Sequence, residues 1–213
     1  MPLLYHNDLG ASSQLGLWEI TEKEEDLLPR LDLSQQETEQ LSQIKGHRRI
    51  EWLAVRQLVH TMSGRLKRVH FIKDEYGKPF LQDADWNISI SHSRTVCAAI
   101  AGPKPVGIDI QLVVPKIERI AHKFMRPVEM ESLQTLTRIP HLHVYWGAKE
   151  ALYKAYGRRQ LDFCQHILIE PFTYAKEGGT TVGKIKKDTI EEKYLLTYFE
   201  HHDYIVVYAV ADN

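Results

Sequence analysis

Cysteine is scarce in this chain, and its two copies offer no structural framework. The 213 residues contain only Cys97 and Cys164, and Cys97 lies in an apolar stretch. Two such residues predict neither a disulfide network nor a zinc site. Long hydrophobic runs are lacking as well: none approaches the length of a membrane span, and no signal-peptide pattern is seen. We therefore expect a cytoplasmic protein without a membrane segment.

An excess of charge of either sign is also lacking. The 27 Lys and Arg residues against 28 Asp and Glu residues give a formal net charge of −1. This balance disfavours a nucleic-acid binder that relies on a broad basic surface. The hydrophobic content of 43% is ordinary for a globular protein. A chain of this length can form one large domain or two small halves.

The first half shows helical patterns followed by strand patterns. Ser34 and Glu37 have the spacing of a capping box. A long helix, with a break at Gly46, is expected to run to Val59. Acidic residues before Pro29 predict a shorter helix, and residues 1–20 read as an extended entry. Strands are predicted at 69–73, 86–91 and 95–101, with a turn at 76–79.

The second half repeats this order after the candidate boundary at 102–105. Its first strand is expected at 106–110, with helices near 117–137 and 143–159. Strands are expected near 167–172, 180–186, 193–200 and 204–210. We therefore predict an α+β fold with two similar lobes, residues 1–102 and 103–213. Two such lobes packed together would leave a cleft suited to a ligand.

The stretch 146–157, WGAKEALYKAYG, separates into two faces on a helix. One carboxylate between two lysines and two aromatic rings could form the floor of an anionic site. Alternatively, Glu150 and Lys154 could form a surface i,i+4 pair. The small face, suited to close packing, contains Gly147, Ala148, Ala151, Leu152 and Ala155, and the opposite face contains Trp146, Lys149, Glu150, Tyr153, Lys154 and Gly157.

Asp109 is the single acid in the apolar strand pattern VGIDI, residues 106–110. Burying a carboxylate is costly unless it is paired or binds a metal. If the fold brings Asp109 close to Glu150, their oxygen atoms would suit Mg²⁺, which binds one or two carboxylates together with substrate phosphates. Backbone amides or an arginine could instead satisfy Asp109.

Two further groups of polar residues suit phosphate binding. The sequence ISISHS, residues 88–93, places hydroxyl groups and an imidazole at a strand end, without the Gly-x-Ser-x-Gly pattern of many hydrolases. It could equally be a serine-rich turn. A basic cluster in the first half could bind a phosphate-rich ligand or form a solvated face; it contains Lys45, His47, Arg48, Arg49 and Arg56.

Five stretches, in this order, resemble the 4′-phosphopantetheinyl transferase superfamily. They are RRIEWLAVR (48–56), YGKP (76–79), ISISHS (88–93), VGIDI (106–110) and WGAKEALYKAYG (146–157). The length is similar to that of the two-lobed, surfactin-synthetase-activating type. The resemblance implies two α+β lobes related by a pseudo-two-fold axis, with the active site in the cleft between them.

The resemblance also implies a reaction. The 4′-phosphopantetheine arm of coenzyme A, the substrate, would be transferred to a serine of an apo acyl or peptidyl carrier protein in a Mg²⁺-dependent step that releases adenosine 3′,5′-bisphosphate. Asp109 and Glu150 would hold the metal, and Glu150 would also act as general base. Lys154, assisted by Lys149, would bind the pyrophosphate and stabilise the leaving group. The other matches to coenzyme A contacts are Lys78, Ser91 and His92, together with Arg48 or Arg49, between which the sequence does not decide.

Gln111 departs from the family pattern, because many members carry an acid there as a third metal ligand. Its amide oxygen, or a water, could take that place. The missing charge keeps a non-catalytic carrier-protein-binding relative open as an alternative, beside another Mg²⁺-dependent phosphate-processing enzyme. We expect a monomer whose partners are the carrier protein and coenzyme A, and no nucleic acid or membrane.

Overall fold

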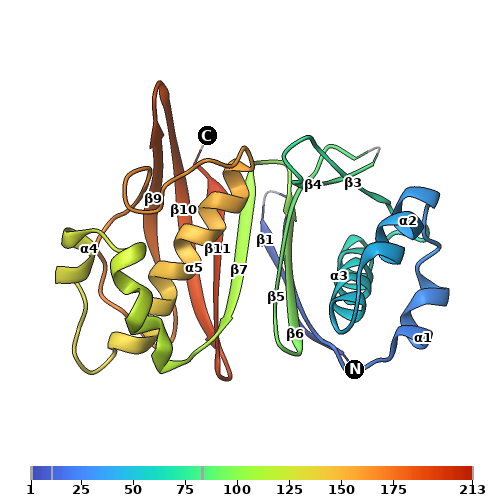
Figure 1. Cartoon of the computed structure of the whole chain (residues 1–213), viewed down its shortest axis with the longest axis horizontal. Coiled ribbons are helices and arrows are strands. Elements are labelled where there is room, and N and C mark those ends of the chain that lie inside the picture. The colour runs from blue at the N-terminus through green and yellow to red at the C-terminus, as the bar shows by residue number, and fades with distance from the viewer. Residues whose placement is uncertain (1, 11, 83, 213) are drawn as a thin grey trace. The chain divides into compact units, whose positions relative to one another are not determined.

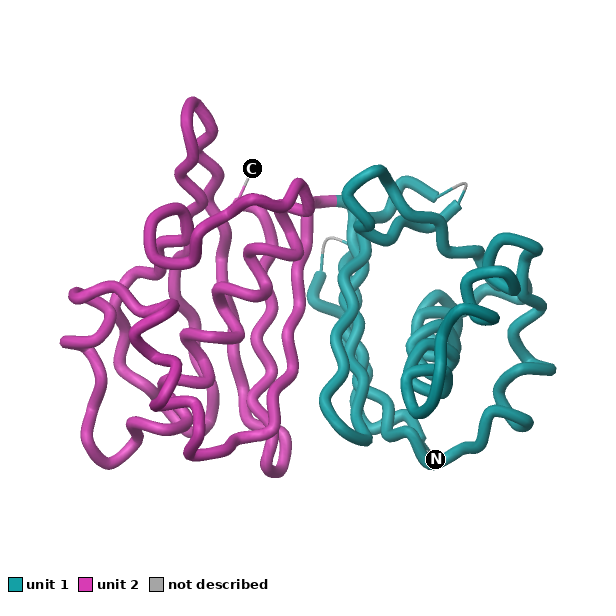
Figure 2. Tube along the Cα trace, viewed as in Figure 1, with its two compact units in different colours: residues 1–103 teal, residues 104–213 magenta. Residues whose placement is uncertain are grey.

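The computed structural model describes residues 2–10, 12–82 and 84–212. The chain divides into two compact units, Met1–Pro103 and Lys104–Asn213 (Figure 2). Each unit has one antiparallel sheet, helices on that sheet and a hydrophobic core of its own. The predicted α+β class is therefore confirmed.

The first unit opens with a hairpin, continues with helices and closes with four strands. The hairpin was not predicted: β1 (Leu3–Gly10) pairs with β2 (Ser13–Glu19), where a single extended entry was expected. The helical segments are α1 (Glu24–Leu27), η1 (Leu28–Arg30), α2 (Gln35–Gln43) and α3 (Arg48–Ser63). The strands are β3 (Phe71–Lys73), β4 (Pro79–Leu81), β5 (Asn87–Ser93) and β6 (Val96–Gly102).

Local signals place the first-unit helices. The Ser34 hydroxyl accepts a hydrogen bond from the Glu37 backbone N–H at 3.2 Å, and the Glu37 carboxylate accepts one from the Ser34 N–H at 3.2 Å. The predicted capping box is therefore present. Gly46 adopts a left-handed φ of 63° between α2 and α3, a conformation that glycine adopts readily. The predicted break between the two helices is confirmed.

The second unit has one strand before its helices and four after them. Its elements are β7 (Val106–Leu112), the 3₁₀ segment η2 (Pro115–Lys123), α4 (Pro127–Glu131), α5 (Arg138–Tyr156), β8 (Ile167–Ile169), β9 (Gly179–Lys187), β10 (Ile190–His201) and β11 (Tyr204–Ala211). The single helix expected at 117–137 is wrong. Arg126 has an extended backbone before Pro127, as the proline ring favours, and this separates η2 from α4.

The two sheets share one topology. Their strand orders are β1-β2-β6-β5-β4-β3 and β7-β11-β10-β9-β8. In each unit the last strand returns to pair with the strand that precedes the helices, β6 with β2 and β11 with β7. Apart from β1, the orders are the same. This is the similarity expected of two related lobes, while their pseudo-two-fold relationship stays a prediction.

The second-unit helix α5 packs closely on its sheet, along β7 and β11 (Figure 1). The small face predicted for this helix is buried. Gly107 permits the contact, because a Cβ there would lie 1.8 Å from the Ala151 carbonyl oxygen. A Cβ on Gly147 would lie 2.7 Å from Val207 Cγ2. Glycine on both the strand and the helix thus brings α5 next to Asp109.

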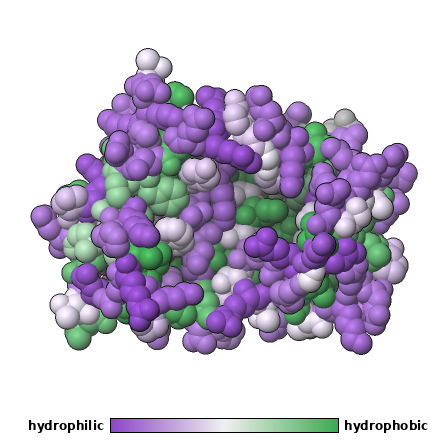
Figure 3. Space-filling view, viewed as in Figure 1, coloured by the Kyte–Doolittle hydropathy of each residue, from purple (hydrophilic) through white to green (hydrophobic). Residues whose placement is uncertain are grey.

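Hydrophilic side chains cover most of the face seen in Figure 3. Among the described residues, no helix combines the length and apolar character that a membrane crossing requires.

Candidate functional site

The first group of candidate residues lies on β7 and α5 of the second unit. Asp109 is buried, with 3% of its surface exposed. Lys154 Nζ lies 2.7 Å from Asp109 Oδ1 and donates a second hydrogen bond, of 2.9 Å, to the Ile108 carbonyl oxygen. The ammonium group therefore neutralises a carboxylate that the apolar strand would otherwise disfavour.

Glu150 lies one helical turn before Lys154 and interacts with both of these charges. Burial raises the pKa of its carboxyl, the negative charge of Asp109 raises it further, and Lys154 opposes the change. The Glu150 side chain is partly exposed and forms no hydrogen bond with another described residue. The fold thus brings two acids and one lysine together, with Glu150 left accessible.

Gln111 lies on the same face of β7 as Asp109, as the alternation of a strand requires. Its Nε2 donates to Asp109 Oδ2 at 2.8 Å. The amide nitrogen faces the carboxylate in this arrangement, so coordination through Oε1 would require the amide to turn.

The chemistry of this group fits Mg²⁺ bound together with a substrate. Two neighbouring carboxylates provide hard oxygen ligands, and the pKa of Glu150 is raised first by burial and then by the negative charge of Asp109. No cluster of three or more His, Cys, Asp or Glu side chains suited to a metal occurs within the described parts of the chain. Mg²⁺ commonly takes only one or two carboxylates and completes its octahedron with water and phosphate oxygens.

The structure disagrees with the role predicted for Lys149. It was expected to assist at the pyrophosphate, but its side chain is completely buried and forms an ion pair with Glu129, with Nζ 2.8 Å from Oε2. The same ammonium donates to the carbonyl oxygens of Phe163 and Ile167 at 2.9 and 3.0 Å. The physical reason is that Lys149 sits at the edge of the helix face and turns into the core. It is a structural residue here.

The second group of candidate residues lies in the first unit, around a cavity of about 470 Å³. We name it the α3–β5 cavity because those two elements supply its walls. It contains three of the predicted ligand-binding residues, Arg48, Ser91 and His92. Ser91 is buried, whereas 54% of the His92 side chain is exposed. The full lining is Ile44, Arg48, Glu51, Trp52, Val55, Arg56, Ile90, Ser91 and His92.

Arg48 and Arg49 are adjacent in sequence but have different surroundings. Arg48 is exposed at the α3–β5 cavity, and its side chain forms no hydrogen bond or ion pair with another described residue. Arg49 forms two hydrogen bonds with Glu24, of 2.5 and 2.8 Å, and donates to the Leu41 and Ile44 carbonyl oxygens. Its guanidinium therefore holds α1 and α2 against α3. Of the two arginines, Arg48 is the one available to a ligand.

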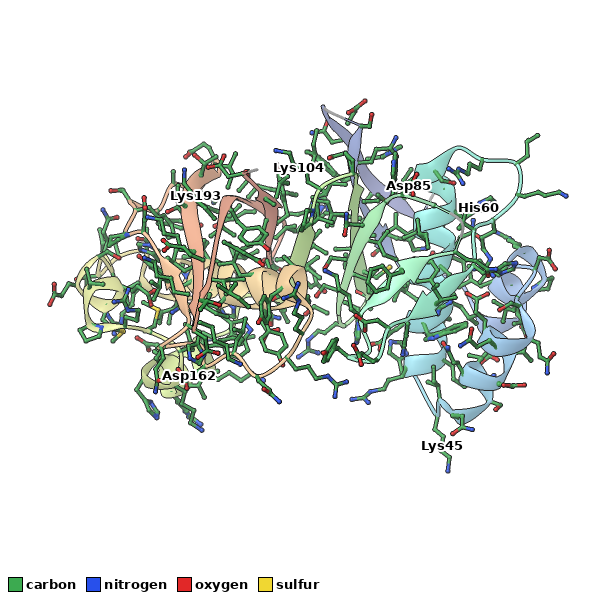
Figure 4. All side chains as sticks on the ribbon, turned by 90° about the horizontal axis from the view of Figure 1, so that it is seen from above. Lys45, His60, Asp85, Lys104, Asp162 and Lys193 are labelled. Carbon is green, nitrogen blue, oxygen red and sulfur yellow. The ribbon has the colours of Figure 1, made fainter. Side chains whose placement is uncertain are left out.

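Of the other predicted basic residues, Lys78 and Lys45 lie outside this cavity, whereas Arg56 lines it. Lys78 ends the β3–β4 turn, where its backbone N–H donates to Asp74 Oδ1 at 2.8 Å. Lys45, in the segment between α2 and α3, points away from the ribbon (Figure 4). Arg56 lines the cavity, but its Nε donates to Glu37 at 3.1 Å and its guanidinium lies 3.1 Å from the centre of the Trp52 ring. Burial lowers the pKa of Arg56 to about 9.

Glu51 is a cavity residue that the sequence interpretation missed. Its carboxylate contacts His92 Nε2 at 3.2 Å and His47 Nε2 at 3.8 Å. The i,i+4 spacing of His47 and Glu51 was visible in the sequence, but the contact with His92 on β5 depends on the fold.

The sequence of the chain matches two family models of known proteins. A model of the 4′-phosphopantetheinyl transferase superfamily matches residues 105–209, and a model of the 4′-phosphopantetheinyl transferase N-terminal domain matches residues 36–102. The first model covers β7 and α5, and the second covers α3 and β5. Together the two models account for most of the chain.

Named relatives agree with the family models. A 4′-phosphopantetheinyl transferase of Bacillus subtilis is 35% identical over 96 residues, which are 42% of each chain. The 4′-phosphopantetheinyl transferase gsp of Aneurinibacillus migulanus is 32% identical over 135 residues, 62% of this chain and 54% of the relative. The chain thus spans about half the length of the curated relatives it matches. It belongs to the 4′-phosphopantetheinyl transferase superfamily, surfactin-synthetase-activating type.

Proposed function

We propose that the protein transfers the 4′-phosphopantetheine moiety of coenzyme A to a serine of an apo carrier protein and releases adenosine 3′,5′-bisphosphate. The observation that carries the proposal is the group of Asp109, Glu150 and Lys154, which lies in the part of the chain matched by the superfamily model. Relatives named 4′-phosphopantetheinyl transferase support the same reaction.

Each residue of this group has a role in the proposal. Asp109 and Glu150 would hold Mg²⁺, which when bound supplies positive charge to the pyrophosphate. Glu150 would accept the proton of the attacking serine hydroxyl. Lys154, now 2.7 Å from Asp109, would move its ammonium to the pyrophosphate. There it would stabilise the 5′-phosphate of adenosine 3′,5′-bisphosphate, which leaves as the bond between the two phosphates breaks and the other phosphate stays with pantetheine on the serine. Phosphoryl-type transfer depends mainly on positioning and on neutralising charge, which these groups provide.

The α3–β5 cavity would bind the nucleotide part of coenzyme A. Arg48 provides a cation available to a phosphate, and Ser91 and His92 provide polar groups in the same wall. Trp52, Val55 and Ile90 provide apolar surface for a ring. Lys78 stays a candidate contact at the β3–β4 turn. Cytoplasmic location, a monomeric state and the absence of nucleic-acid partners also stay proposals.

The test is modification of a panel of apo carrier proteins, followed by intact mass spectrometry. We expect a gain of one phosphopantetheine with Mg²⁺ and none with a chelator or with a carrier whose acceptor serine is replaced by alanine. Asp109→Ala should abolish the gain under limiting Mg²⁺, whereas Asp188→Asn, at an exposed turn, should preserve it. Release of adenosine 3′,5′-bisphosphate without carrier modification would favour another phosphate-processing enzyme. Carrier binding without chemistry would favour a non-catalytic relative.

A further inference from the structure

Glu51 places a carboxylate in the wall of the α3–β5 cavity. Oε2 lies 3.2 Å from His92 Nε2, and Oε1 lies 3.8 Å from His47 Nε2. Each oxygen therefore faces one imidazole. Only 12% of the Glu51 side chain is exposed, against 54% of the His92 side chain. The contact joins the first turn of α3 to the end of β5.

The charged and titratable groups around Glu51 show why the histidines are its partners. Arg56 points its guanidinium to Glu37 and to the Trp52 carbonyl oxygen. Cys97, opposite His92 on β6, carries a thiol whose pKa is raised mainly by burial, so it stays neutral. Arg48 lines the same cavity and forms no ion pair with any described residue. Glu51 thus contacts the imidazoles and leaves the charge of Arg48 available to a ligand.

We propose that Glu51 is a positioning residue, which holds the His92 imidazole at the cavity wall so that His92 and Arg48 can bind an anionic group of coenzyme A together. The inference rests on the proposed function for the identity of the ligand. A half-exposed histidine without this contact would have to be ordered during binding, and ordering one side chain lowers affinity. A carboxylate that only repelled the anion would have the opposite effect, because its removal would tighten binding.

A double-mutant cycle on coenzyme A affinity separates these possibilities. Glu51→Ala should weaken binding about three- to tenfold in the wild-type background. In a His92→Ala background the same change should have almost no effect, because the residue that Glu51 positions is gone. Glu51→Gln keeps an acceptor of similar shape and should recover part of the affinity.

In steady-state kinetics, Glu51→Ala should raise the KM for coenzyme A while kcat at saturating coenzyme A is retained. Glu39→Gln, which removes an exposed carboxylate on α2, is the matched control and should change neither.

A measurement without ligand tests the contact itself. The side-chain NMR resonances of His92, assigned by their loss in His92→Ala, should shift in Glu51→Gln and stay in place in Glu39→Gln. Unmoved resonances, equal effects of Glu51→Ala in both backgrounds, or tighter binding by Glu51→Ala would each overturn the role of Glu51. A wild-type protein that binds no coenzyme A would instead overturn the proposed function, so the two failures are distinguishable.

Discussion

Lys149 and Glu129 form an ion pair enclosed in the second unit, with Nζ 2.8 Å from Oε2 and neither side chain exposed. The pair is fully hydrogen-bonded. Besides the two carbonyl oxygens that accept from Lys149, the Glu129 carboxylate accepts from the backbone N–H groups of Arg126 and Ile169 at 2.8 and 3.1 Å. The network joins α5 to the start of α4 and to β8. Its lysine, Lys149, directly precedes Glu150 in the sequence.

Lys149→Met should therefore reduce stability more than it reduces the affinity for coenzyme A. Removing one partner leaves the Glu129 carboxylate buried without compensation, which typically costs about 3–5 kcal/mol. Urea unfolding measures this loss. Lys184→Met is the control, because Lys184 pairs with Glu170 at 2.9 Å in a partly exposed ion pair, and ion pairs in contact with solvent contribute about 0–1 kcal/mol. Unchanged stability with lost coenzyme A binding would restore Lys149 to the ligand site.

Arg48→Ala and Arg49→Ala should have different consequences although the residues are adjacent. Arg48 should recognise the 3′-phosphate, so its removal should shrink the preference for coenzyme A over desphospho-coenzyme A by about 1.5–3 kcal/mol, the range for hydrogen bonds to charged groups. Arg49→Ala should preserve the preference and lower thermal stability, because it releases Glu24. Calorimetric titration of both cofactors decides this. Equal affinity of the wild type for the two would contradict the prediction.

Glu150→Gln should affect chemistry more than binding. The amide keeps the shape and one coordinating oxygen but cannot accept the serine proton, and loss of a general base typically lowers the rate about 10²- to 10⁴-fold. Single-turnover rates at saturating coenzyme A and carrier measure the effect, with Glu177→Gln at an exposed turn as control. A rate equal to that of the wild type would remove Glu150 from the role of base.

His141 should make the protein less stable in mild acid. It is completely buried, stacks on Tyr145 with ring centres 5.1 Å apart, and both its ring nitrogens lack a hydrogen-bond partner among the described residues. Burial lowers its pKa to about 4 from the ordinary 6.5. The unfolded chain therefore binds the proton first. The contribution of His141 is fully present above pH 6.5 and is lost as the pH falls toward 4.

His141→Phe should weaken the dependence of the unfolding free energy on pH. Between pH 7 and pH 5 the wild type should lose about 2 kcal/mol of unfolding free energy through His141, by linkage between protonation and folding. Urea unfolding at both pH values, compared with the variant and with His122→Gln at an exposed site, measures the difference. A variant with the same pH dependence as the wild type would show that His141 does not titrate in this range.

Sequence patterns predicted the features that depend on neighbouring residues. Ser34 and Glu37 are three positions apart, so their reciprocal capping is local, and Gly46 interrupts the helix through its own backbone. The small face of α5 follows from helical periodicity in the same way. Contacts between elements distant in the sequence could not be predicted in this way. The burial of Lys149 depends on Glu129 and on two carbonyl groups that only the fold brings together, and Glu51 meets His92 across two elements.

The shared topology does not account for the position of the carboxylate group, which lies in the second unit. Gly16 on β2 pairs with Ala99 on β6, as Gly107 on β7 pairs with Ala209 on β11. Two residues further along each strand, β2 carries Trp18 where β7 carries Asp109. The first unit has the same strand order as the second but an indole at this position, so the carboxylate cannot be predicted from topology and depends on the residue itself.

Gln111→Glu should give the protein a metal affinity of its own. The wild-type amide donates to Asp109 Oδ2 at 2.8 Å, so the glutamate would replace an attractive contact with repulsion between carboxylates. A divalent cation relieves that repulsion. We expect Mg²⁺ to bind the variant, without coenzyme A, about tenfold more tightly, since about 1.4 kcal/mol of added attraction gives this factor.

Calorimetric titration of Mg²⁺ into the coenzyme A-free wild type and variant measures the difference, and Gln43→Glu, an exposed change on α2, controls for net charge. Mg²⁺ should also raise the unfolding free energy of Gln111→Glu more than that of the wild type, because the ion binds the folded arrangement. Turnover need not rise, because a third carboxylate weakens the pull of the metal on the phosphates. Equal Mg²⁺ affinity in both proteins would mean that residue 111 does not face the metal. Asp109 and Glu150 would then hold Mg²⁺ without a contribution from residue 111.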